Sequence, residues 1–123
     1  MNQRSRRAAD YLRHILDAIE RIGVYTAGLD SADELERNGI VLDAVVRNLE
    51  ICGEAAVKIE RDAPALVESS GDIPWKLMRT MRNKMIHSYF EVDAKVVWAT
   101  IRIDLPALRP RIEALLAGGL KEE

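Results

Sequence analysis

The 123-residue sequence is poor in residues that crosslink chains or bind metals. It has one cysteine, Cys52, so no internal disulfide can form, and we expect a reducing compartment, the cytoplasm. Its two histidines, His14 and His87, lie far apart in the sequence. We therefore expect no tetrahedral zinc site and no cofactor. Aromatic residues are only 5%, with seven glycines and four prolines, which favours helices over a β-sandwich or barrel.

Long apolar runs and an excess of basic residues are also missing. No stretch approaches eighteen apolar residues, so we expect no transmembrane helix and no membrane partner. The basic start, MNQRSRRAAD, is not followed by the apolar core of a signal peptide. The net charge is -2, whereas a domain that wraps duplex nucleic acid is normally basic. Any role in binding nucleic acid must therefore depend on a local basic patch.

The remaining composition is that of a globular helical domain. Hydrophobic residues make up 48% and charged residues 31%, which argues against disorder. The length predicts one domain, residues 1–117, followed by a frayed tail at 118–123. No strand pattern is present, and apolar residues recur at spacings of three and four. We predict an all-α, up-and-down bundle of four main helices.

The helix boundaries follow from the same periodicity and from capping residues. The four main helices are expected at about 4–25, at about 40–61, from 72–75 onward, and from about 93 onward. Ser31 and Glu34 have the spacing of a capping box, which predicts a short extra helix ending near residues 38–39. Pro106 should kink or split the last helix. Residues 62–71, which include Pro64, are expected to be irregular.

Several residues have packing roles suggested by their size and spacing. The second long helix contains three small residues that should let another helix approach it closely: Gly53, Ala55 and Ala56. Trp75 and Trp98 are expected to anchor the core. A stripe of three methionines suits a contact between helices or between subunits: Met78, Met81 and Met85.

The segment 73–90 has the most unusual charge pattern. It contains four cations and no carboxylate, so its local charge is +4 in a chain that is net negative. Two of these cations, Arg82 and Lys84, lie in a window that also contains Asn83, His87 and Tyr89. This window concentrates a guanidinium, an amide, an imidazole and a phenol, which are groups that bind and cleave phosphodiesters.

These groups suit cleavage of RNA without a metal ion. His87 could remove the proton of a 2′-OH because its ordinary pKa is near neutrality. Arg82 could grip the phosphate, and Asn83 could hold a phosphate oxygen or orient the imidazole. On a regular helix, residues five apart diverge by about 140°, so Arg82 and His87 would not meet. Either the helix unwinds near His87 or a second copy of the chain completes the site.

Each of these residues could instead have a purely structural role. A histidine near a helix end is often a cap, and an arginine beside methionines often only extends past them to solvent. His14 is expected on the solvated surface, and Cys52 in the core rather than as a nucleophile. Glu50 and Glu54 could act as acid and base, but a salt-bridged face is the default, with Arg47 close enough to pair with Glu50.

The sequence around His87 resembles a known motif. Arg82-Asn83, three further residues and His87-Ser88-Tyr89 are similar to the RX4HXY motif of HepT-like toxins in the HEPN superfamily. The resemblance covers nearly the whole chain in the expected order, through four further blocks: residues 43–55, residues 73–75, residues 97–98 and residues 104–108. Ser88 departs mildly from it, because glycine is frequent there in the family.

The resemblance implies an all-α protein that forms a homodimer, with motifs of both subunits lining one cleft. It implies that Arg82 and His87 are the ribonuclease pair and that Asn83 is an accessory polar group. It also implies that Tyr89 can receive AMP from a partner, an MNT-type nucleotidyltransferase antitoxin. Lys76, Arg79 and Lys84 would then bind the RNA backbone.

Two functions remain open at this point. The first is a metal-independent endoribonuclease toxin of a type VII-like toxin–antitoxin pair, acting on tRNA or mRNA. The alternative is a catalytically silent HEPN subunit that binds a nucleotidyltransferase, which the low overall basicity and small size favour. The two differ in whether RNA cleavage depends on Arg82 and His87.

Overall fold

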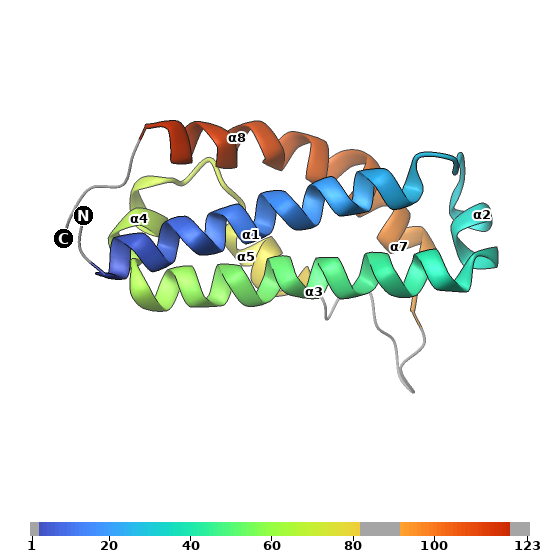
Figure 1. The fold of residues 1–123 in the computed structure, drawn as a ribbon, viewed down its shortest axis with the longest axis horizontal. Coiled ribbons are helices and arrows are strands. Elements are labelled where there is room, and N and C mark those ends of the chain that lie inside the picture. Colours follow the sequence, from blue (N-terminus) through green and yellow to red (C-terminus); the bar gives the residue numbers. More distant parts are fainter. Residues whose placement is uncertain (1–2, 82–91, 119–123) are drawn as a thin grey trace.

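The computed structural model describes residues 3–81 and 92–118, and these are predominantly helical (Figure 1). The predicted all-α class is confirmed by eight helical segments among these residues. They are α1 (Gln3–Thr26), α2 (Ala32–Arg37), α3 (Gly39–Asp62), α4 (Pro64–Ser69), α5 (Trp75–Arg79), α7 (Ala94–Ala99), the π-helical turn η2 (Thr100–Asp104) and α8 (Leu105–Ala117).

The two longest helices, α1 and α3, run antiparallel along each other and form the body of the molecule (Figure 1). Helix α8 runs antiparallel to α1, and α5 packs against α3. The apolar faces of these helices enclose one core, with fully buried Leu12, Ile15, Leu49, Ile59 and Ile112. The stripes that define these faces were readable at helical spacing in the sequence.

Capping residues set several of the helix ends. The hydroxyl of Ser31 accepts a hydrogen bond from the Glu34 N–H at 3.2 Å, which starts α2 as predicted. The Glu34 carboxylate in turn accepts from the Asp30 N–H at 2.6 Å, one residue before the position expected for a capping box. Asn38 ends α2 and caps α3, accepting from the Val41 N–H at 3.3 Å. These bonds explain why the boundaries were predictable to within one or two residues.

The expectation that residues 62–71 are irregular is wrong. The short helix α4 starts directly at Pro64, whose missing N–H costs nothing in the first turn of a helix. It ends at Ser69, and the next hydroxyl, that of Ser70, donates to the Leu66 carbonyl at 2.5 Å. Proline and serine thus mark the two ends of a short helix here, although their pattern in the sequence predicts a loop.

The last helical region is interrupted at the predicted place. Between α7 and α8 the backbone forms the π-helical turn η2, in which the Leu105 N–H donates to the Thr100 carbonyl, five residues back. Pro106 follows directly, and its ring would clash with the carbonyl four residues before it in a regular α-helix. Pro110, which lies within α8, interrupts the hydrogen bonding without ending the helix.

The predicted packing residues have mixed positions. Trp75 is buried, whereas Trp98 is only partly buried and has the Arg102 guanidinium carbon 4.4 Å from its ring centre. Met78 and Met81 lie in the core of this chain, so they serve contacts between its own helices. The third methionine of the stripe, Met85, lies outside the described residues. In the part of the chain that is described, no helix is long and apolar enough to cross a membrane.

Candidate active site

Both predicted catalytic residues, Arg82 and His87, lie outside the described part of the chain. So do three further predicted site residues: the accessory Asn83, the RNA-binding Lys84 and the AMP acceptor Tyr89. The two remaining predicted RNA-binding residues, Lys76 and Arg79, are on α5, and both are exposed. Helix α5 ends three residues before Arg82. The geometry described below is therefore that of α5, the helix that leads into the motif, and of the residues that hold this helix in place.

Helix α5 is held firmly at both ends. At its start, the indole N–H of Trp75 donates to Ser70, with distances of 3.1 Å to the hydroxyl and 3.3 Å to the carbonyl. Near its end, Met78 is fully buried. The hydroxyl of Thr80 donates to the Lys76 carbonyl at 3.0 Å, and Met81 is again buried. The chain is thus fixed in the core up to the residue before Arg82.

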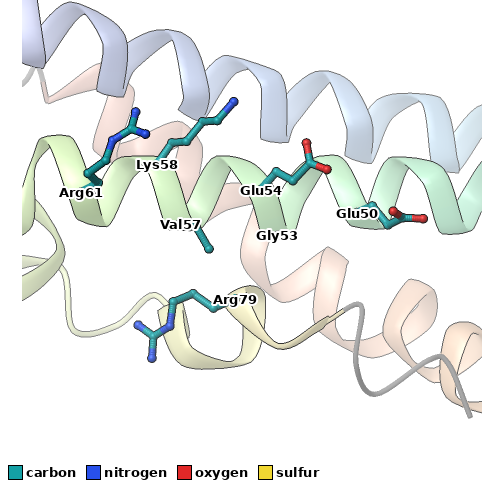
Figure 2. A pocket seen from close by; sticks show the side chains of 7 residues that line it. All are labelled: Glu50, Gly53, Glu54, Val57, Lys58, Arg61 and Arg79. Atoms are coloured by element: carbon teal, nitrogen blue, oxygen red, sulfur yellow. The ribbon is translucent and has the colours of Figure 1, made fainter.

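A groove of about 570 Å³ lies between α3 and α5, beside this point (Figure 2). Helix α3 contributes all but one of the residues that line it: Glu50, Gly53, Glu54, Val57, Lys58, Arg61 and, from α5, Arg79. Carboxylates line the part nearer the start of α3, and cations line the part nearer its end (Figure 2). Half-exposed Val57 and buried Gly53 lie between them.

The cations of the groove are partly engaged within the protein. The Arg79 guanidinium pairs with the Glu60 carboxylate of α3. Arg61 pairs with Asp62 at 3.2 Å, and this contact lowers the pKa of the Asp62 carboxyl. The Lys58 ammonium lies 5.6 Å from the centre of the Tyr11 ring, a cation–π contact with α1. Arg79 therefore ties α5 to α3 and is not simply a free RNA-binding cation.

The other predicted chemical candidates have structural settings. His14 is exposed on α1, and the centre of its ring lies 6.0 Å from that of Tyr11 in an edge-to-face arrangement. Cys52 is fully buried, and desolvation raises its pKa to about 12, so it is not a thiolate nucleophile at neutral pH. Arg47 lies 3.7 Å from Glu54, two turns along α3, which fits the expected salt-bridged face. No group of three potential metal ligands occurs within residues 3–81 and 92–118.

Two cations on the α3 side of the groove, Lys58 and Arg61, were not among the predicted site residues. Lys58 and Arg61 fall on the same face as Glu50 and Glu54, at spacings of three, four and seven residues. This periodicity was available in the sequence. What the sequence could not give was the partner, because α5 and its Arg79 reach this face only through the tertiary fold.

Comparison with known proteins assigns the chain to a family. Residues 15–115 match the family described as "Ribonuclease HepT-like". A protein of Thermococcus cleftensis named "Probable ribonuclease HepT" is 42% identical over 106 residues, which cover 86% of this chain and 93% of that protein.

Two further relatives are named "Putative RNase". One, from Caldanaerobacter subterraneus subsp. tengcongensis, is 33% identical, with 86% of this chain and 91% of that protein covered. The other, from Methanocaldococcus jannaschii, is 35% identical, with 86% and 88% covered. No solved structure matches the chain significantly. The chain belongs to the HepT-like ribonuclease family of the HEPN superfamily.

Proposed function

We propose that this ribonuclease is a metal-independent endoribonuclease toxin whose catalytic pair is Arg82 and His87, brought together in the cleft of a homodimer. The observation that carries the proposal is the complete Arg82, His87 and Tyr89 motif within a chain of the HepT-like ribonuclease family. The anchored helix α5 supports it, because the buried side chains of Trp75, Met78 and Met81 fix the chain in the core up to the residue before the motif.

The proposed reaction is an attack of the RNA on its own backbone. His87 takes the proton from a 2′-OH, and the 2′ oxygen forms a bond to the adjacent phosphorus. The bond from phosphorus to the 5′ oxygen breaks, this leaving oxygen takes up a proton from water, and His87 releases the proton it accepted to the solvent. The Arg82 guanidinium stabilises the charge that builds up on the phosphate oxygens, and Asn83 is an accessory polar group. The products are a 2′,3′-cyclic phosphate and a free 5′-OH.

The support for RNA binding is electrostatic. Lys76 and Arg79 are exposed on α5, on the approach to the motif, and Lys84 adds a third cation to the same segment. Such cations contact the phosphate backbone of tRNA and mRNA alike, so they bind without selecting one sequence. Removing them should raise KM for RNA and make RNA binding less sensitive to salt, because fewer phosphate contacts release fewer counterions.

Cleavage of a labelled RNA by single variants tests the catalytic pair. His87→Ala and Arg82→Ala should each lose about 10²- to 10⁴-fold in rate. The matched controls are His14→Ala and Arg37→Ala, which remove exposed groups on α1 and α2 and should cleave like the wild type. Full cleavage by His87→Ala would refute the catalytic assignment. No cleavage by the wild type, together with a nucleotidyltransferase complex that survives Arg82→Ala, would favour the alternative, a catalytically silent binding subunit.

We further propose that an MNT-type nucleotidyltransferase antitoxin neutralises the toxin in the cytoplasm by adding AMP to Tyr89. The phosphate of AMP would bring negative charge and bulk to the most basic segment of the chain and would repel RNA there. Co-expression with a neighbouring nucleotidyltransferase gene should add mass in AMP units, and Tyr89→Phe should abolish the addition. Modification of Tyr89→Phe at the wild-type level would place the acceptor elsewhere.

A further inference from the structure

We infer that Gly53 and Glu60 of α3 are positioning residues for RNA cleavage, because together they hold α5, and through it the start of the catalytic segment, at a fixed place on α3. This inference rests on the proposed function, since it concerns how Arg82 is placed. Neither residue belongs to the RX4HXY motif. Both act on the described residues that lead directly into it.

Gly53 brings two backbones into direct contact. It is buried, and a Cβ atom built on it would lie 3.1 Å from the Met78 carbonyl oxygen and 4.0 Å from that of Arg79. The first distance is tighter than nine in ten real Cβ contacts. The opposing atoms belong to the backbone of α5 and cannot turn aside as the end of a side chain could. Any larger residue at position 53 must therefore push the last turn of α5 away from α3 by a few tenths of an ångström.

Glu60 supplies a second tether on the same face of α3. It lies seven residues after Gly53, which is two helical turns and nearly the same direction from the helix axis. Its carboxylate pairs with the Arg79 guanidinium of α5. Both side chains are partly shielded, with 28% and 36% exposure, so water screens the pair less than it would on the open surface. The backbone contact at Gly53 limits how closely α5 approaches α3. The ion pair between Glu60 and Arg79 prevents α5 from moving away from α3.

The contacts made by Gly53 and Glu60 affect catalysis because only residues 80 and 81 separate α5 from Arg82. Arg82 comes three residues after Arg79, and Met81 between them is buried in the core. A displacement of α5 is therefore passed on to the residue that grips the phosphate. Because misplacing a catalytic group by 1 Å can cost about 10²-fold in rate, a shift of a few tenths of an ångström has a measurable effect.

Steady-state cleavage of a labelled RNA tests the inference, with each variant assayed well below its own melting temperature. Gly53→Ala should lower kcat about tenfold and leave KM within about twofold. Its control, Gly23→Ala, adds a Cβ with no atom within 4 Å and should keep the wild-type kcat. Glu60→Gln lies at the surface and tests the second tether without crowding the core. It should lower kcat about threefold, and its control is Glu36→Gln, which changes an exposed carboxylate on α2.

Exchanging the charges of Glu60 and Arg79 distinguishes the positioning role of this ion pair from the proposed role of Arg79 in RNA binding. Glu60→Arg alone should lower kcat, because it places two cations together. Adding Arg79→Glu should restore kcat by rebuilding the pair, while KM rises because a proposed RNA-binding cation is lost. Effects of a merely destabilised fold would change the melting temperature without this split between kcat and KM.

The outcomes distinguish a failure of the proposed function from a failure of the positioning role alone. If wild-type cleavage does not depend on Arg82 and His87, the proposed function fails, and this inference fails with it. If that dependence holds while Gly53→Ala and Glu60→Gln keep the kcat of their controls, the inference alone is overturned. A loss expressed entirely in KM would equally overturn it, because it would make α5 a binding element and not a positioning one.

Discussion

Two glycines in long helices, Gly23 in α1 and Gly53 in α3, should respond in opposite ways to the same substitution. Gly23 is exposed, and a Cβ there would meet no atom within 4 Å. Gly53 is buried, and a Cβ there would meet the Met78 carbonyl oxygen at 3.1 Å. The pair therefore separates the helix propensity of alanine from the steric cost of a tight crossing between helices.

The magnitudes follow from these two environments. Replacing glycine by alanine inside a helix gains about 1 kcal/mol, chiefly because the unfolded chain loses conformational freedom. Gly23→Ala should show this gain in full and raise Tm by about 4 °C in a domain of this size. At Gly53 the same gain is opposed by overpacking, which costs about 1–3 kcal/mol in a close-packed interior. The net effect of Gly53→Ala should range from about zero to about 2 kcal/mol of destabilisation.

Urea unfolding followed by circular dichroism measures both variants against the wild type. The expected difference between the two free energies of unfolding is about 1–3 kcal/mol, with Gly23→Ala the more stable. Equal stabilisation by both substitutions would refute the reasoning, because it would mean that the Met78 carbonyl yields at no cost. The contact could then not hold α5 in place.

Three further predictions concern single residues. The Cys52 thiol, whose pKa is raised to about 12 by burial, should not react with a thiol reagent at pH 8 until the protein is unfolded; reaction at the rate of a free thiol in the folded state would contradict its burial. Asp62 has a lowered pKa, because Arg61 donates to its carboxylate. It therefore contributes stability above the ordinary aspartate pKa that is lost as the pH falls through its lower folded value. Asp62→Asn should flatten the fall in unfolding free energy between roughly pH 5 and pH 3, and an unchanged slope would rule this out. The Asp93 carboxylate accepts bonds of 3.0 and 3.3 Å from two N–H groups of the first turn of α7. Asp93→Ala should cost about 1 kcal/mol in urea unfolding, and an unshifted midpoint would contradict this capping role.

Local chemistry made much of the fold predictable from the sequence. The side chain of Ser31 caps α2, and periodic apolar residues mark the buried faces of α1 and α3. Pro106 interrupts the last helical region because its ring and missing N–H act within one turn of the chain. Each of these signals is read from residues that lie within a few positions of one another.

The features that were missed depend on context or on distant partners. Pro64 starts a helix or breaks one according to its position in the turn, and the sequence pattern favoured the wrong choice. Gly53 was expected to admit a close neighbour, but which carbonyl it would face is decided only when α5 folds back onto α3. Arg79 looked like a free cation in its own segment, because its partner Glu60 is nineteen residues away. For the site, the motif itself was readable in the sequence, whereas the contacts that hold α5 against α3 became visible only in the structure.

The most direct test of the account is the chemistry of the cleaved ends in the presence of EDTA. Wild-type protein and the His14→Ala control should produce RNA fragments that end in a 2′,3′-cyclic phosphate, identified by mass spectrometry, and His87→Ala should produce none above background. Cleavage that EDTA abolishes, or fragments that end in a 3′-OH, would contradict a metal-independent attack by the 2′-OH with His87 as its base.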